Sequence, residues 1–170
     1  MLSHSNSVSF PQTKPMLLFN QLSKQYVWLK HEQRFFHTLY FISKFYKIDV
    51  RYVCAIIHLE SYDKKHRPTL KQMQYAHSKK DARGLMQVLP THYDGNPIDL
   101  YGITLNLNRG CWYLRKCLVR AKGNPKQAAR LYNAGINNHE NHYKNWKKYA
   151  IPVTENFIRS LAANAQYCPM

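Results

Sequence analysis

The chain has 170 residues, which is enough for one domain with a single hydrophobic core. Hydrophobic residues make up 45% of it and aromatic residues 14%, and this composition excludes a disordered chain. Lysine and arginine outnumber aspartate and glutamate by 25 to 9, so the formal net charge is +16. Such a charge favours a polyanionic partner, and nucleic acid, an anionic membrane and a carboxylate-rich cell wall all fit.

The N-terminal residues show no standard signal peptide, which leaves an earlier removal of such a segment or another export route open. Residues 1–15 are polar and contain two prolines, which predicts a flexible arm before a domain over residues 16–170. Only residues 16–19 resemble the apolar core of a signal peptide, and they are too few and lack an adjoining basic region. No apolar run is long enough for a transmembrane helix. The four cysteines have no CxxC spacing, so a thiolate zinc site is not expected.

The first third of the chain has helical periodicity. Residues 17–45 place apolar side chains at helical spacing, which predicts one or two amphipathic helices. The pattern breaks at residues 46–49, and Asp49 is suited to cap the helix that follows.

The helix expected over residues 50–61 ends in a carboxylate on its apolar face. Val50, Val53, Ile57 and Glu60 recur at helical spacing and share one side of the helix. A glutamate there is costly unless it is paired, protonated or used in chemistry. Burial and the negative end of the helix dipole both raise a carboxyl pKa, which is how a general acid is made. The competing interpretation is a helix end that frays into solvent.

The middle of the chain alternates between polar and apolar segments. Residues 62–83 are polar and basic, and a short helix is expected over residues 69–78. Residues 84–90 are apolar between a glycine and a proline, which predicts a tight, buried corner. Residues 91–103 contain turn-forming residues and are expected to form a surface loop.

Helices are expected over the rest of the chain as well. Residues 106–121 form one helix, and Asn124 and Pro125 are suited to start the next, which ends before Gly135. A last helix is expected over residues 154–165, capped by Thr154. No alternating strand pattern of useful length is present, so the predicted fold class is all-α.

Three short motifs occur in a fixed order in these elements. They are Glu60-Ser61, Gly84-Leu85-Met86-Gln87 and Tyr132-Asn133-Ala134-Gly135. In this order they resemble the soluble lytic transglycosylase family. Two further segments, Asn106 to Leu114 and Pro152 to Ile158, are similar to the family's helix between the motifs and to its terminal segment. The resemblance covers residues 40–160 and implies a lysozyme-like helical domain with a cleft that holds the catalytic glutamate.

The sequence departs from the family pattern at several points. The gap between Glu60 and Gly84 is longer than usual, which suggests an insert over residues 62–80. Asp81 stands where a glycine is common, Leu131 replaces the usual alanine, and Phe157 stands where the family has tyrosine. The last change removes a hydroxyl from the expected neighbourhood of the site.

The resemblance implies a reaction and a set of site residues. The family cleaves the bond between N-acetylmuramic acid and N-acetylglucosamine in peptidoglycan and leaves a 1,6-anhydromuramyl end. One glutamate, here Glu60, acts first as acid and then as base, with no cofactor and no metal. Tyr132 is expected to hydrogen-bond or orient Glu60. Ser61, Gln87 and Asn133 are expected to bind the sugar, and Met86 to shape the cleft wall and offer its carbonyl.

Each of these residues also has a purely structural interpretation. Ser61 can end a helix, Met86 and Tyr132 can pack in the core, Gln87 can satisfy the backbone of the corner, and Asn133 can end a helix with Gly135. Two of the nine histidines, His139 and His142, lie three apart, but no motif supports a metal site there.

Two other functions compete with the transglycosylase. A goose-type lysozyme-like hydrolase shares the Gly-Leu-Met-Gln-Val string, but it has an aspartate at the position of Leu89. Asp94 or Asp99 could take that place only if the loop that holds them folds back. A basic nucleic-acid-binding module would explain the charge, although no motif of such a module is present. The resemblance places the protein in the periplasm or cell envelope, with wall turnover, a secretion or conjugation apparatus or a phage particle as settings.

Overall fold

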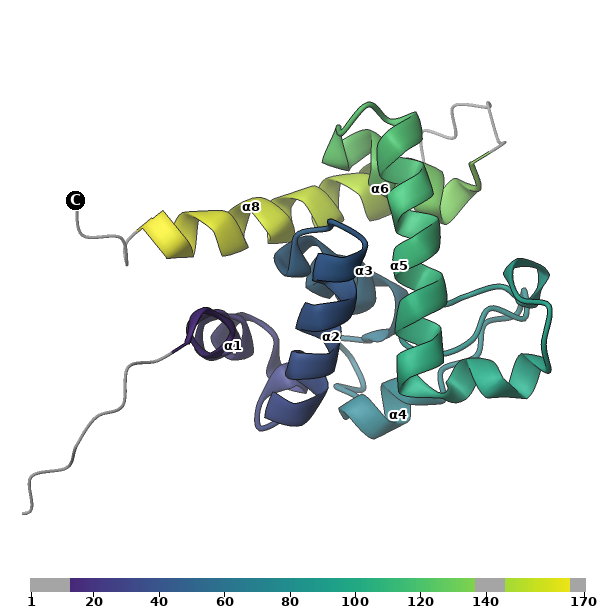
Figure 1. The fold of residues 1–170 in the computed structure, drawn as a ribbon, viewed down its shortest axis with the longest axis horizontal. Coiled ribbons are helices and arrows are strands. Elements are labelled where there is room, and N and C mark those ends of the chain that lie inside the picture. The colour runs from purple at the N-terminus through teal and green to yellow at the C-terminus, as the bar shows by residue number, and fades with distance from the viewer. Residues whose placement is uncertain (1–12, 137–145, 166–170) are drawn as a thin grey trace, which may run out of the picture.

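The computed structural model describes residues 13–136 and 146–165, and its regular secondary structure in these ranges is helical (Figure 1). The α-helices are α1 (Lys14–Gln25), α2 (Gln33–Phe45), α3 (Val50–Ser61), α4 (Leu70–Gln74), α5 (Ile103–Arg120), α6 (Pro125–Ala134) and α8 (Ile151–Ala165). Short 3-10 turns η1 (Val27–Leu29), η2 (Pro90–His92) and η3 (Pro97–Tyr101) and the π-helical turn η4 (Trp146–Ala150) connect them. The described residues contain no strand, only isolated bridges from Arg83 to His77 and to Val88. The all-α prediction is confirmed.

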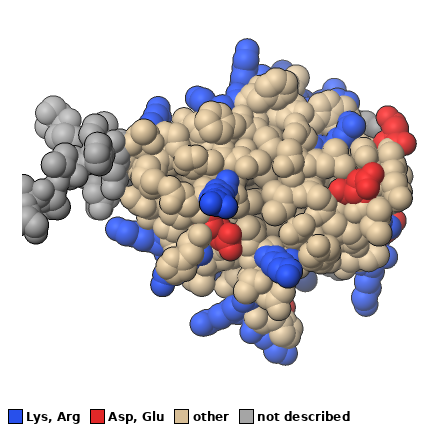
Figure 2. Space-filling model, turned by 60° about the horizontal axis from the view of Figure 1, so that its bottom comes forward, with Lys and Arg blue, Asp and Glu red and all other residues tan. Residues whose placement is uncertain are grey.

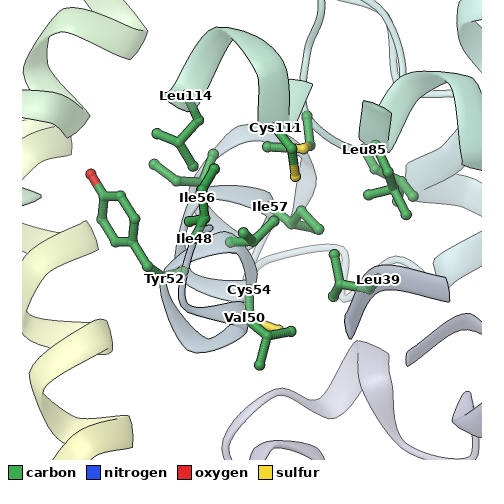
Figure 3. Packing of buried hydrophobic residues seen from close by; sticks show 14 of the residues in the cluster. Leu39, Ile48, Val50, Tyr52, Cys54, Ile56, Ile57, Leu85, Cys111 and Leu114 are labelled. Carbon is green, nitrogen blue, oxygen red and sulfur yellow. The ribbon is translucent and has the colours of Figure 1, made fainter. Parts of the chain in front are cut away.

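Helix α3 lies in the centre of the core (Figure 3). Its side chains from Tyr52 to Ile57 are all buried, and it packs against α2 and α8. The Asp49 side chain accepts a hydrogen bond from the Arg51 amide at 2.9 Å, so the predicted N-cap is confirmed. A helix buried on most sides is fixed in position by its neighbours, and it therefore holds its last residues, Glu60 and Ser61, in a defined place.

The predicted start of a helix agrees with the structure where the capping side chain was identified correctly. The Asn124 side chain accepts from the Gln127 amide at 3.0 Å and Pro125 is the first residue of α6, as predicted. The prediction for Thr154 is wrong, because α8 begins at Ile151. The Thr154 hydroxyl donates to the Ala150 carbonyl at 2.7 Å, four residues back within the helical segment, and does not accept from an amide as an N-cap would.

The predicted buried corner is confirmed, and Asn106 on α5 holds it in place. Its amide nitrogen donates to the carbonyls of Arg83 and Leu100, both at 2.8 Å, and its oxygen accepts from the Met86 amide at 2.9 Å. Gly84 has a φ of +74°, and a Cβ there would lie 2.4 Å from the Asn106 amide nitrogen. Only glycine fits at that position, because both the backbone conformation and the space exclude a side chain.

Helix α5 approaches the corner closely through a second glycine. A Cβ on Gly110 would lie 2.4 Å from the Met86 sulfur, so the absence of a side chain there lets Met86 pack directly on α5. Residues Leu85, Met86 and Val88 are buried as expected. The corner is thereby fixed from the α5 side, and its Met86 carbonyl is presented at a defined point.

Basic side chains are scattered over the surface. On the face shown in Figure 2, lysine and arginine protrude at many separate points and acidic side chains are few. The segment expected as an insert begins in turns after α3 and contains the short helix α4, whose Thr69 and Gln72 form a capping box. Among the described residues, no helix is long and apolar enough to span a membrane.

Candidate active site

Glu60 lies in the last turn of α3, between the buried body of the helix and the molecular surface. Its side chain is partly exposed, whereas Ile56 and Ile57 one turn earlier are fully buried. The apolar face predicted for this helix is thus confirmed through Ile57 and leads directly to Glu60. A carboxyl group in this position is surrounded by protein and still accessible from outside, as a general acid must be.

The surroundings of Glu60 favour its protonated form. Burial raises the pKa of Glu60 from 4.5 to about 7, although hydrogen bonds with Tyr149 and Asn133 lower it. Desolvation dominates because the ionised carboxylate loses more hydration than the two hydrogen bonds replace. No other carboxylate contributes to this pKa among the described residues. A group that titrates near pH 7 can both give and take a proton under neutral conditions.

Tyr149 is the residue at this site that the sequence analysis missed. Its hydroxyl lies 2.5 Å from Oε1 of Glu60 and donates a hydrogen bond to it. Burial and the neighbouring Glu60 raise the pKa of Tyr149, so the hydroxyl keeps its proton. Phe157, where the family pattern has tyrosine, instead packs its ring 5.3 Å from the ring of Tyr52. Tyr149 precedes Phe157 by two helical turns, and it supplies a tyrosine hydroxyl to the site.

Replacing Tyr149 by phenylalanine is expected to raise the pKa of Glu60 further. The lost hydrogen bond stabilises the carboxylate, and a bond to a charged group is worth about 1.5–3 kcal/mol, or about one to two pH units. The pKa can be followed by NMR of carboxyl-labelled glutamate in wild type and Tyr149→Phe. Tyr52→Phe is the matched control, because the Tyr52 hydroxyl donates to the Pro125 carbonyl and not to Glu60. An unchanged or lowered pKa in Tyr149→Phe would contradict the assigned role.

Ser61 connects the end of α3 to the corner. Its hydroxyl lies 3.1 Å from the Ile57 carbonyl and 2.9 Å from the Leu85 carbonyl, so one proton is shared between two acceptors. The second contact joins the residue after Glu60 to the Gly-Leu-Met-Gln motif. The first two motifs are therefore in direct contact, and the corner is held beside Glu60.

The Tyr132 hydroxyl makes a different contact from the one expected. It is buried and donates to the Met86 carbonyl at 2.8 Å, so its proton is not available to Glu60. The expected hydrogen bond from a tyrosine to Glu60 comes from Tyr149. Tyr132 still lies near enough for the charge of Glu60 to raise the pKa of Tyr132, after the larger effect of burial. Through Met86, Tyr132 joins the third motif to the second.

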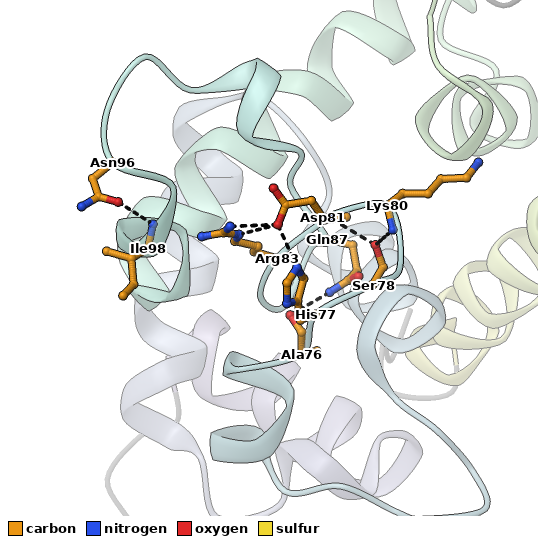
Figure 4. A network of polar contacts seen from close by, with 10 residues as sticks. Ala76, His77, Ser78, Lys80, Asp81, Arg83, Gln87, Asn96 and Ile98 are labelled. Carbon is orange, nitrogen blue, oxygen red and sulfur yellow. Dashed lines mark hydrogen bonds and ion pairs between the residues drawn. The ribbon is translucent and has the colours of Figure 1, made fainter.

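Met86 and Gln87 serve the structure of the corner. The Met86 side chain is fully buried, and its carbonyl is the acceptor for Tyr132. Gln87 has a φ of +48°, and its amide nitrogen donates to the carbonyls of Ala76 and Gly84 at 3.2 and 2.9 Å. The contact with Ala76 belongs to the polar network in Figure 4, where Asp81 also accepts hydrogen bonds from Arg83 and contacts His77. Gln87 is half-buried, and its carbonyl oxygen has no partner in these contacts.

Asn133 comes to Glu60 from the last turn of α6. Its side chain is exposed and forms the second hydrogen bond that lowers the pKa of Glu60. The following Gly135 has a φ of +95° and its amide donates to the Leu131 carbonyl at 2.9 Å, which ends the helix there. The structure therefore brings Ser61, Met86, Tyr132 and Asn133 together around Glu60 and the corner.

The remaining candidate groups near Glu60 are structural or lie elsewhere. His58 accepts a hydrogen bond from the Trp28 indole at 3.3 Å and stacks on Tyr62. Burial lowers the pKa of His58 to about 4, so its imidazole is neutral at pH 7 and does not serve there as a general acid. Residues 13–136 and 146–165 contain no cluster of three or more metal-ligating side chains. His139 and His142 lie outside the described residues.

Comparison with known proteins identifies the family and the fold of the domain. The chain matches the transglycosylase SLT domain over residues 40–153. Among solved structures, it is similar to an inactive mutant of the lytic transglycosylase Slt from Pseudomonas aeruginosa, in which a glutamate is replaced by glutamine. The TM-score is 0.54 at 22% identity, over 82% of this chain and 23% of that one, so the likeness shows the shared lysozyme-like fold. No curated protein matches the chain. From the domain match, which covers all three motifs, the chain belongs to the family of transglycosylase SLT domains.

Proposed function

We propose that the protein is a peptidoglycan lytic transglycosylase with Glu60 as its single acid and base. The observation that carries this proposal is the carboxyl group of Glu60, whose pKa burial raises to about 7 and which contacts Tyr149 and Asn133. Family membership supports the same conclusion, because SLT domains are usually lytic transglycosylases. Peptidoglycan carries carboxylates on its peptide stems, so the basic surface suits this substrate.

The reaction needs only one carboxyl group. Protonated Glu60 gives its proton to the oxygen of the β-1,4 bond between N-acetylmuramic acid and N-acetylglucosamine, and the bond from that oxygen to C1 breaks. The carboxylate of Glu60 then takes the proton of the muramyl C6 hydroxyl while O6 bonds to C1. The products are a free 4-hydroxyl and a 1,6-anhydromuramyl end, and Glu60 is protonated again. No water is consumed, so a second carboxylate is not required.

The other site residues are assigned roles in binding and positioning. The exposed Asn133 amide and the side-chain oxygen of Gln87 are our candidates for contacts with the sugar N-acetyl and hydroxyl groups. The Ser61 hydroxyl donates to the Leu85 carbonyl at 2.9 Å, and the Tyr132 hydroxyl donates to the Met86 carbonyl at 2.8 Å. These two hydrogen bonds fix the position of the corner relative to Glu60. We assign Ser61, Met86 and Tyr132 to positioning, and residues 62–80 remain our proposed insertion beside the site.

The reducing ends of the products test this proposal. Digested sacculi are expected to release muropeptides with 1,6-anhydro ends, which are lighter by one water molecule than hydrolysed ends in mass spectrometry. Hydrolysed reducing ends would instead indicate the goose-type lysozyme alternative, in which water attacks C1. That alternative is disfavoured because Leu89 stands in place of the aspartate, and Asp99 accepts a hydrogen bond from Tyr93 at 3.2 Å. Binding to single-stranded DNA without any sacculus turnover would overturn the enzyme proposal altogether.

The proposed substrate places the protein at the cell envelope. Peptidoglycan lies in the periplasm or outer wall, so the protein would act there. A secretion apparatus, a conjugation apparatus or a phage particle would each need an enzyme that opens the wall locally. The described part of the chain, one small helical domain, is compatible with each of these settings.

A further inference from the structure

Two adjoining cavities lie at the opposite end of α3 from Glu60. They have volumes of about 510 and 410 Å³ and share Lys47, Ile48 and Asp49 as walls. We call the two together the basic groove. Glu60 lies ten residues along α3 from Val50, or about 15 Å at the rise of an α-helix. Neither cavity is lined by Glu60 or by any residue of the three motifs. The basic groove is therefore separate from the proposed catalytic site.

The basic groove holds a surplus of positive charge. Its walls carry six cationic side chains and one carboxylate, namely Lys14, Lys44, Lys47, Arg51, Arg115 and Lys122 with Asp49. Asp49 is already occupied, because it accepts from the α3 backbone and from the Arg51 guanidinium. Among the described residues, Lys47, Arg115 and Lys122 have no ion-pair partner. A concave surface with uncompensated charge of one sign concentrates its field on a ligand of the opposite sign.

Two of these lysines occupy unusual backbone positions. Lys47 follows the end of α2 with a φ of +54°, and Lys122 follows the end of α5 with a φ of +50°. Glycine is the most common residue in this left-handed conformation after a helix. Both helix ends converge on the same cavity. The ends of two separate helices therefore each place a cation on the wall of one groove.

The rest of the wall is apolar, and this decides what kind of anion fits. Ile48, Leu118 and Phe157 line the larger cavity, and Val119 at its edge is 63% exposed. Tyr52 is only 2% exposed and offers no face on which a nucleic-acid base could stack, and the ring of Phe157 already packs against Tyr52. A phosphodiester or glycan strand would leave the apolar wall in contact with water. A concave surface also cannot lie flat on a membrane.

We propose that the basic groove binds an acidic segment of a partner protein that also carries apolar side chains. The carboxylates of this segment would lie beside Lys47, Arg115 and Lys122, and its apolar side chains would cover Leu118, Val119 and Phe157. Charge complementarity would orient the segment, and burial of apolar area would supply much of the affinity. This site does not depend on the proposed catalytic function, because it shares no residue with Glu60 and its neighbours.

Fluorescence anisotropy with two labelled peptides tests the site. One short peptide alternates glutamate with leucine, and the matched peptide has serine in place of leucine. The leucine peptide is expected to bind at least about tenfold more tightly, since 1.4 kcal/mol corresponds to tenfold. Arg115→Glu with Lys122→Glu should weaken its binding by about tenfold or more. The control pair, Lys79→Glu with Lys80→Glu, changes charge equally on exposed residues outside the groove and should have less than about a twofold effect.

Each outcome of this experiment is decisive. Equal binding of the two peptides would remove the role of the apolar wall, and equal weakening by both charge reversals would reduce the effect to net charge. Tighter binding of oligothymidine or anionic vesicles through Arg115 and Lys122 would assign the groove to another ligand. Arg115→Gln with Lys122→Gln repeats the test without reversed charge, with thermal melting as the check on folding. Sacculus digestion should stay unchanged in Arg115→Gln with Lys122→Gln, whether or not the peptide binds, because neither residue lies at the proposed catalytic site.

Discussion

Glu60→Gln is expected to abolish sacculus digestion and to leave the fold intact. General acid–base catalysis contributes about a hundredfold to ten-thousandfold to a rate, and here both proton transfers fall on one group. Glutamine has nearly the same shape, so its carbonyl oxygen can still accept from the Tyr149 hydroxyl. The measurement is the initial rate of muropeptide release, with circular dichroism to verify the helical content.

A second glutamate provides the control for this loss. Glu155 lies on α8 with an exposed side chain, and Glu155→Gln makes the same chemical change away from the site. Its digestion rate should equal that of the wild type within about twofold, because surface changes of this kind are close to neutral. Substantial turnover by Glu60→Gln would mean that another residue is the acid. Loss of activity in both variants would point to a general effect of charge.

The same substitution is expected to stabilise the protein at alkaline pH. Burial raises the pKa of Glu60 from 4.5 to about 7. The folded state therefore keeps a proton on Glu60 that the unfolded state has released between these two pH values. By linkage, the stabilising contribution of protonated Glu60 is fully present below about pH 4.5 and is lost as the pH rises through about 7. Glutamine has no such transition.

Urea unfolding of wild type and Glu60→Gln at pH 4.5 and pH 8 measures this effect. Relative to wild type, Glu60→Gln should gain roughly 2–3 kcal/mol of unfolding free energy between the two pH values, after allowance for partial exposure of the carboxyl. Other titrating groups cancel in the difference between the two proteins. A difference that is constant with pH would show that the pKa of Glu60 is not raised. Such a gain would mean that the wild-type protein is less stable at alkaline pH because it keeps a catalytic acid at this position.

Local sequence features predicted the helices wherever a cap or a pattern acts over a few residues. Asp49 and Asn124 were identified as N-caps because a capping side chain contacts amides two or three residues away. The apolar face from Val50 to Ile57 follows from the helical repeat alone. Thr154 was misassigned because a threonine hydroxyl can cap a helix or donate to a carbonyl four residues back, and only the start of α8 decides between these.

The contacts that make the candidate site span long stretches of chain and could not be read from local patterns. Tyr149 and Glu60 are 89 residues apart, and Tyr132 and Met86 are 46 apart. Tyr132 was expected at Glu60 from the family pattern, but the orientation of α6 places its hydroxyl on the Met86 carbonyl. Asn106 belongs to a helix that resembles the family's, but its three hydrogen bonds to the corner depend on how α5 packs there.

The sequence by itself determined the helical class, the order of the motifs and the carboxyl at the end of an apolar helix, because these depend on neighbours within a few residues. The tertiary structure decided which tyrosine meets Glu60, how far burial raises its pKa, and that lysines after two separate helices line one groove. Those properties depend on distances between residues remote in the chain and on the solvent excluded between them. The position of Glu60 at the end of its helix thus follows from the local sequence, whereas its pKa and its hydrogen bonds depend on the tertiary structure.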